Sequence, residues 1–187
     1  MPRARQALLE AAHRVLEDQP WQSVRMADVA ASAGVSRQTL YNAFGTKEGL
    51  AGALLRRAAA DYLAGVDRAL TAPGPDRPAA LALWTVRAAR RDVLVRALLT
   101  GHWGDGLPRP DRRPGSRGRT GGTPPPTPEE LLVLVRERAA AVSPGAAGRC
   151  EIAYRIALSC VIAPVPGDDA AGTWALRLVR EATRTTG

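Results

Sequence analysis

A run of polar side chains near the front of the sequence has the chemistry to hydrogen-bond to nucleic acid. The run contains Arg37, Gln38, Thr39, Tyr41 and Asn42. Amides form paired hydrogen bonds with base edges, and hydroxyls bond to bases or to phosphate oxygens. A helix that is merely solvated would more often carry Glu and Lys, so this combination indicates a surface that reads DNA.

The spacing of these residues predicts one helix, from Arg37 to Phe44, with two different faces. At 100° per residue Phe44 lies about 40° from Leu40, so both side chains would face a core. Gln38 and Asn42 lie about 160° from Leu40, on the opposite side. The amides therefore point away from the protein, with the hydroxyls on the flanks.

The residues around this helix predict how it is held. A short helix from about Met26 to Ala33 precedes it, Gly34 allows a left-handed turn, and Ser36 is a suitable N-cap. Two short helices joined by a tight turn that contains glycine form a helix-turn-helix, whose second helix enters the major groove. An earlier helix, from about Arg3 to Glu17, completes a three-helix DNA-binding domain.

The longer string "MADVAASAGVSRQTLYNAFGTKEGL" resembles the signature of the tetracycline-repressor (TetR) family. The matching residues are Val29-Ala30, Ala33-Gly34-Val35-Ser36, Leu40-Tyr41, Phe44 and Lys47, in order and spacing. The resemblance covers about residues 5–55. It implies a transcriptional repressor that binds a palindromic double-stranded DNA operator as a homodimer, with a helical C-terminal domain that dimerises and encloses a small molecule.

The resemblance also implies which residues contact DNA. They are Arg25, Arg37, Gln38, Thr39, Tyr41, Asn42 and Lys47. Lys47 would meet a phosphate, and the others would meet bases or backbone. One departure concerns Arg25, because members of the family usually have Thr there as the N-cap of the second helix. The cap hydrogen bond is lost, but the charge of Arg25 can hold a phosphate.

The rest of the chain predicts an all-α protein, because apolar residues recur at spacings of three and four and rarely alternate with polar ones. The expected helices span about 46–70, 79–90, 92–99, 128–142, 146–162 and 169–184. We place the DNA-binding domain at residues 1–48 and a helical effector-binding and dimerisation domain at residues 49–187. Within the second domain, residues 104–128 are rich in Pro and Gly and predict a mobile loop.

Aromatic residues of the C-terminal domain are the candidate ligand contacts. They are Trp84, Trp103 and Tyr154. Because the chain has only one Phe, they supply most of its flat apolar surface. They predict a small, mostly apolar organic effector; the alternative is that each is a core or interface residue. A filled C-terminal core would give a constitutive DNA-binding repressor without a ligand.

Apolar positions on the last two helices predict a homodimer interface. The candidates are Ile152, Ile156, Cys160, Trp174 and Leu178. The helix from Ala146 to Ile162 is apolar over so wide an arc that it can serve both its own core and a partner. Two such helices from each chain would form a four-helix bundle across a two-fold axis.

Composition favours DNA and argues against other classes of protein. The net charge of +8 suits a polyanionic partner, although residues 1–50 carry six basic side chains against five acidic ones. No nucleophile motif, Gly-rich phosphate loop or metal-ligand spacing occurs, so we expect no enzyme, no metal and no cofactor. No apolar run is long enough for a membrane span and no signal peptide is recognisable, so we expect no membrane partner and a cytoplasmic protein.

Overall fold

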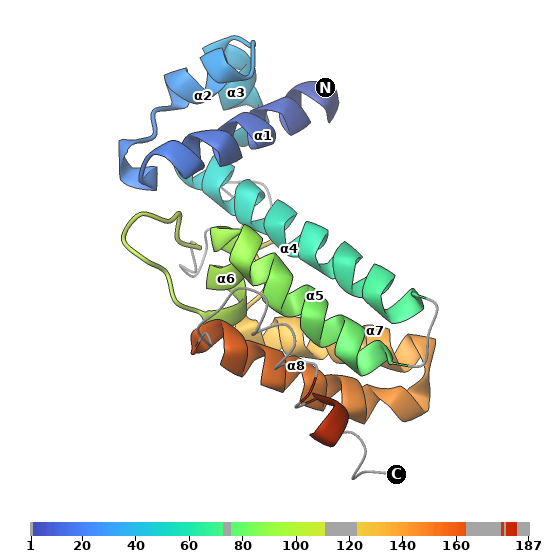
Figure 1. Ribbon diagram of the computed structural model, residues 1–187. Helices are drawn as coiled ribbons and strands as arrows, with labels where there is room; N and C mark the ends of the chain where they lie inside the picture. The colour runs from blue at the N-terminus through green and yellow to red at the C-terminus, as the bar shows by residue number, and fades with distance from the viewer. Residues whose placement is uncertain (1, 73–75, 111–122, 164–176, 178, 183–187) are drawn as a thin grey trace. The chain divides into compact units, whose positions relative to one another are not determined.

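The computed structural model describes residues 2–72, 76–110, 123–163, 177 and 179–182, which are mostly helical and include no strand. The elements are α1 (Pro2–Asp18), η1 (Trp21–Ser23), α2 (Met26–Ser32), α3 (Arg37–Phe44), α4 (Lys47–Thr71), α5 (Arg77–Arg91), α6 (Val93–Thr100), α7 (Pro128–Val142), η3 (Pro144–Ala146) and α8 (Ala147–Ile162) (Figure 1). The all-α prediction is confirmed. No helix in the described part of the chain has the length and apolarity to cross a bilayer.

Local signals place most helix ends within a residue or two of the prediction. Asp92 begins α6, because its carboxylate accepts from the backbone N–H groups of Leu94 and Val95 at 2.8 and 3.4 Å. Thr127 begins α7 as part of a capping box, in which Thr127 and Glu130 each accept from the other's backbone N–H. The expected final helix, 169–184, falls mostly outside the described residues, of which 177 and 179–182 are helical.

The chain divides into two compact units. One contains residues 1–58 with 103–125, and the other contains residues 59–102 with 126–187. These bounds differ from the predicted domains, 1–48 and 49–187, because the first half of α4 and a later segment join the N-terminal unit. The helix α4 is continuous through the division.

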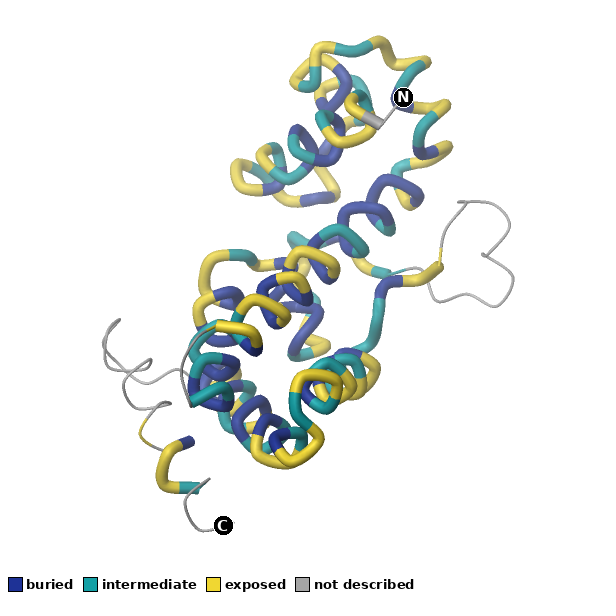
Figure 2. The backbone as a smooth tube through the Cα atoms, turned by 90° about the vertical axis from the view of Figure 1, so that its right-hand side faces the viewer, coloured by how far each residue is buried: buried dark blue, intermediate teal, exposed yellow. Residues whose placement is uncertain are grey.

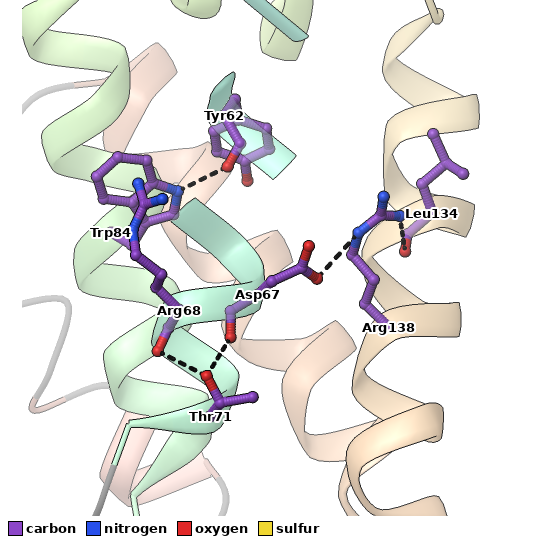
Figure 3. A network of polar contacts seen from close by, with 7 residues as sticks. All are labelled: Tyr62, Asp67, Arg68, Thr71, Trp84, Leu134 and Arg138. Carbon is purple, nitrogen blue, oxygen red and sulfur yellow. Dashed lines mark hydrogen bonds and ion pairs between the residues drawn. The ribbon is translucent and has the colours of Figure 1, made fainter. Parts of the chain in front are cut away.

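The C-terminal unit has a core in which small side chains let two helices approach closely. The cluster consists of Ala79, Ala82 and Val86 from α5, Ala153, Ala157 and Cys160 from α8, and Val179. Buried residues recur along each of these helices with exposed ones between them (Figure 2). An ion pair of 3.1 Å between Asp67 and Arg138 joins α4 to α7 (Figure 3).

The described ends of the 104–128 segment pack within the N-terminal unit. The backbone N–H of Trp21 donates to the carbonyl of Gly106 at 2.8 Å, and the Gln22 amide donates to the carbonyl of Asp105. The guanidinium of Arg56 donates to the carbonyl of Thr123 at 2.9 Å. Residues near both ends of the segment predicted as a mobile loop therefore make hydrogen bonds within this unit, and the contacts come from backbone carbonyls, which composition does not report. Residues 111–122 lie outside the described part.

Candidate nucleic-acid interface

The start of α3 is fixed by the turn that precedes it. Gly34 has a φ of +67°, which favours glycine, and leads the chain out of α2. The Ser36 hydroxyl accepts from the backbone N–H of Thr39 at 3.1 Å, as the sequence predicted. The two hydroxyls of Ser36 and Thr39 also lie 2.9 Å apart. Thr39 is therefore tied to the N-cap at the end of the helix that would approach a phosphate.

One face of α3 packs against α1 and α2. Leu40 and Phe44 are 0% and 5% exposed, which confirms the predicted inner face. The opposite face carries the exposed amides of Gln38 and Asn42, and Tyr41, on the flank, is 47% exposed. The amide nitrogen of Gln38 donates to Oδ1 of Asn42 at 2.8 Å. This bond leaves the Gln38 oxygen as an acceptor and the Asn42 nitrogen as a donor.

Two arginines of the helix-turn-helix, at the N-cap position of α2 and the first residue of α3, have charges not engaged elsewhere in the described structure. Arg25 and Arg37 are exposed, and neither guanidinium makes a hydrogen bond or ion pair with a described residue. Arg25 occupies the N-cap position of α2 without a side-chain cap bond, as its departure from Thr predicted. Both are sterically free to meet a phosphate.

Lys47 lies in a different setting from these arginines. Its ammonium donates to the carbonyl of Gln22 at 3.1 Å and lies 5.4 Å from the ring centre of Trp21. Burial lowers the pKa of Lys47, and the neighbouring Glu48 opposes that shift. Trp21 is 8% exposed, so its side chain belongs to the core of this unit. Lys47 thus ties the start of α4 to η1 and keeps further N–H donors for a phosphate.

Arg5 was not among the sequence candidates, yet it contacts the helix that carries them. Its Nη1 donates to the carbonyl of Ala43 at 2.7 Å, and its guanidinium lies 4.5 Å from the ring centre of Phe44. Arg5 belongs to α1, whereas both partners belong to the last turn of α3. No local pattern signals this contact, because it joins residues 38 positions apart.

Of the three aromatic candidates for ligand contact, Trp84 and Tyr154 belong to the C-terminal unit. Trp84 lies against α4, where its Nε1 donates to the carbonyl of Tyr62 at 3.1 Å and Arg68 lies 5.7 Å from its ring centre (Figure 3). A Cβ at Gly65 would overlap the Trp84 indole, so this side chain has a packing role. Trp103 belongs to the other unit.

Tyr154 is the aromatic candidate that the structure buries completely. Its hydroxyl has no hydrogen-bond partner in the described structure, although the nearby Tyr62 hydroxyl influences its pKa, which burial raises. Tyr62 is already engaged: its hydroxyl lies 3.0 Å from that of Thr85, which donates to the carbonyl of Leu81 at 2.9 Å. Since Thr85 uses its proton on Leu81, Tyr62 must donate to Thr85.

The three dimer candidates of α8 differ in how far they are buried. Ile152 and Ile156 are half-buried, and Ile156 packs against the α5–α8 core. Cys160 is 2% exposed and belongs to that core, which leaves no surface for a second chain. Trp174 and Leu178 lie outside the described residues.

Comparisons with known proteins assign the N-terminal helices to a family. Residues 8–54 match the family described as "Bacterial regulatory proteins, tetR family". Over 47 residues the chain is 45% identical to "HTH-type transcriptional regulator AlkX" of Mycobacterium tuberculosis. That match spans 25% of this chain and 22% of the relative, so it covers no more than a quarter of either protein.

Solved structures resemble the chain over nearly its whole length. The TetR family repressor AlkX of Dietzia sp. strain DQ12-45-1b, implicated in biodegradation of n-alkanes, has a TM-score of 0.56 at 23% identity, with 97% of this chain and 96% of that chain covered. The transcriptional regulator FadR of Bacillus subtilis, solved with stearoyl-CoA, has a TM-score of 0.58 at 13% identity, with 93% and 96% covered. At these identities the likeness shows the fold. The match over residues 8–54, a quarter of the chain, shows that the N-terminal helices are similar to those of the tetR family of bacterial regulatory proteins.

Proposed function

We propose that this protein is a transcriptional repressor that binds a palindromic operator as a homodimer and is released by a small, mostly apolar organic effector. The observation that carries the proposal is the outer face of α3, where amides and a phenol are exposed beside two arginines that have no partner among the described residues. Such a face supplies base contacts, while the flanking charges supply phosphate contacts.

The paired amides support a specific kind of base contact. With Gln38 bonded to Asn42, the pair offers one acceptor oxygen and one amide donor on the same face. Adenine presents the complementary N6 donor and N7 acceptor in the major groove. We expect an adenine at the position of the operator that meets this pair.

The proposed dimer uses the half-buried isoleucines of α8. Ile152 and Ile156 retain apolar surface, and Ile162, at the end of the same helix, is 63% exposed. Cys160 is not part of the proposed interface, because other side chains of the same chain bury it. A two-fold dimer would place two α3 helices about 34 Å apart, one turn of DNA, to meet two half-sites.

Tyr154 supports a ligand inside the C-terminal unit. A buried hydroxyl without a partner costs about 1 to 3 kcal/mol, and a bound molecule with one polar group would recover part of that cost. The apolar surroundings of Tyr154 suit a ligand that is otherwise hydrocarbon. The FadR structure holds stearoyl-CoA, so long-chain acyl and alkyl compounds are reasonable first probes.

Selection of bound sequences from random DNA duplexes tests the central proposal. We expect a palindromic consensus with half-site centres about one helical turn apart, and light scattering should give the mass of a dimer. Absence of any consensus would refute DNA reading by α3, and a monomeric mass at micromolar concentration would refute the dimer. Addition of alkyl and acyl probes to the complex then tests release: if every compound that stabilises the protein leaves the complex intact, it is a constitutive repressor.

A further inference from the structure

We propose that Arg5 is a positioning residue for DNA recognition, which fixes the C-terminal end of α3 so that Tyr41 and Asn42 meet the major groove at the correct angle. This inference rests on the proposed function and adds to it a residue of α1 that no DNA-contact assignment includes. Two contacts from one guanidinium carry it: the 2.7 Å bond to the carbonyl of Ala43 and the 4.5 Å approach to the Phe44 ring.

The first contact satisfies a backbone group that the helix itself leaves open. The last four carbonyls of a helix have no intrahelical partner. The carbonyl of Tyr41 accepts from Gly45 at 2.7 Å, and that of Phe44 accepts from Thr46 at 2.8 Å. Of the two carbonyls between them, that of Ala43 accepts from Arg5. Its positive charge also suits the negative end of the helix dipole.

The second contact explains why the residue is an arginine. A guanidinium is planar and can donate an in-plane hydrogen bond while its face lies over an aromatic ring. Phe44 is 5% exposed, so the ring held in this way is part of the core of the N-terminal unit. An ammonium at this position would carry the same charge but could not make both contacts in this geometry.

The origin of Arg5 in another helix gives the contact its consequence. The Ser36 cap and the Gln38–Asn42 bond both lie within α3 or next to it, so they set the shape of the helix but not its orientation. Arg5 attaches the far end of α3 to α1 instead. Because base contacts need donors and acceptors placed within about 0.5 Å, loss of this attachment should reduce sequence reading more than general affinity for DNA.

The competing role is a direct phosphate contact. Arg5 is exposed, and its charge is close enough to Arg56 to contribute, after burial, to the lowered pKa of that residue. A phosphate contact would need only the charge, so Lys would replace Arg with little loss. It would also weaken binding to every duplex alike and reduce the salt slope by about one.

The experiment compares Arg5→Ala and Arg5→Lys with the wild type on the selected operator and on a scrambled duplex, over a series of salt concentrations. Arg3→Ala is the matched control, because Arg3 is an exposed arginine of the same helix that makes no contact with a described residue. We expect both Arg5 variants to bind the operator about tenfold more weakly or worse, with Arg5→Lys unchanged on the scrambled duplex and in its salt slope. Arg3→Ala should change both duplexes equally.

Each other outcome rejects the inference. Wild-type operator binding by a folded Arg5→Lys shows that charge alone suffices. Equal loss on both duplexes, with a salt slope lower by about one, shows a phosphate contact. A wild-type protein that does not distinguish the two duplexes refutes the proposed function itself, and the positioning role with it. Circular dichroism establishes folding, and Arg5→Lys keeps the test valid if Arg5→Ala unfolds.

Discussion

The polar groups on α3 of the N-terminal unit are exposed, whereas a group of hydroxyls in the C-terminal unit is buried. In the N-terminal unit the amides of Gln38 and Asn42 face outward, where a partner can reach them. In the C-terminal unit the hydroxyls of Tyr62, Thr85 and Tyr154 face inward and are buried. The difference indicates that recognition of a large partner requires groups presented on a rigid surface, whereas a buried network can respond only to something that enters the core.

Removing the outward groups should have the largest effect on function. We expect Gln38→Ala and Tyr41→Ala each to weaken operator binding by about 1 to 3 kcal/mol, because each removes a contact that identifies a base. The side chains are exposed, so thermal stability should change little. Fluorescence titration with operator and scrambled DNA checks this. Unchanged operator binding by both folded variants would mean that α3 does not read the sequence.

The same substitution, Gly to Ala, at two positions of α4 tests how tightly the helix is packed in each unit. A Cβ at Gly65 would overlap the Trp84 indole, so Gly65→Ala should cost about 1 to 3 kcal/mol of unfolding free energy. A Cβ at Gly52 would meet only Nη1 of Arg56, at 3.2 Å, which is the far end of a flexible side chain that also donates to the carbonyl of Thr123. Gly52→Ala should therefore be neutral or gain up to about 1 kcal/mol of helix propensity. Urea denaturation of both variants measures the difference, and equal stabilities would show that Trp84 moves freely.

Lys47 combines the two features compared above: it belongs to the N-terminal unit, as the exposed amides do, yet it is partly buried. If its ammonium meets a phosphate, Lys47→Ala should weaken all duplexes alike and lower the salt slope by about one. Loss of its bond to Gln22 should also lower stability by about 1 kcal/mol. Salt titrations of DNA binding separate these effects. An unchanged slope with lower stability would restrict Lys47 to holding η1.

Substitutions in the buried group of hydroxyls in the C-terminal unit should have the smallest effects on stability, with opposite signs for the two tyrosines. Tyr154→Phe removes a buried hydroxyl that has no partner, so it should be neutral or stabilising by up to about 1 kcal/mol. Tyr62→Phe removes the donor to Thr85 and should destabilise by about 1 kcal/mol. Thermal and urea unfolding without any probe provide the measurement. Destabilisation by Tyr154→Phe would mean that its hydroxyl has a partner in solution.

The sequence predicted the exposed face of α3 better than it predicted the packing of the C-terminal unit. The face of α3 follows from the 100° turn per residue, and the Ser36 cap follows from residue type, so Leu40, Phe44 and the amides were placed correctly. Such features depend only on neighbours in the chain. Burial of Cys160 in its own core and the position of Trp84 on Gly65 depend on which helices pack together. Neither a helical wheel nor composition contains that information.

The contact of Arg5 shows the same limit within the DNA-binding unit. An arginine in the first turns of α1 has no local signature that distinguishes it from Arg3, and its partners are 38 residues away. The ends of the 104–128 segment were missed for the same reason, since their contacts use backbone carbonyls. In a long-range contact to a backbone group, the residue that supplies that group can be of any type. No sequence motif therefore predicts such a contact.

The hydrogen bond between Gln22 and Asp105 affects when, during synthesis, the N-terminal unit can form all its contacts. It joins residues 83 positions apart, so α1, η1, α2 and α3 leave the ribosome long before the segment that completes their unit. During that interval the Trp21 N–H lacks its Gly106 acceptor, and η1 is held from one side only, by Lys47. Until the segment after α6 is synthesised, the η1 turn therefore lacks two of its hydrogen-bond partners.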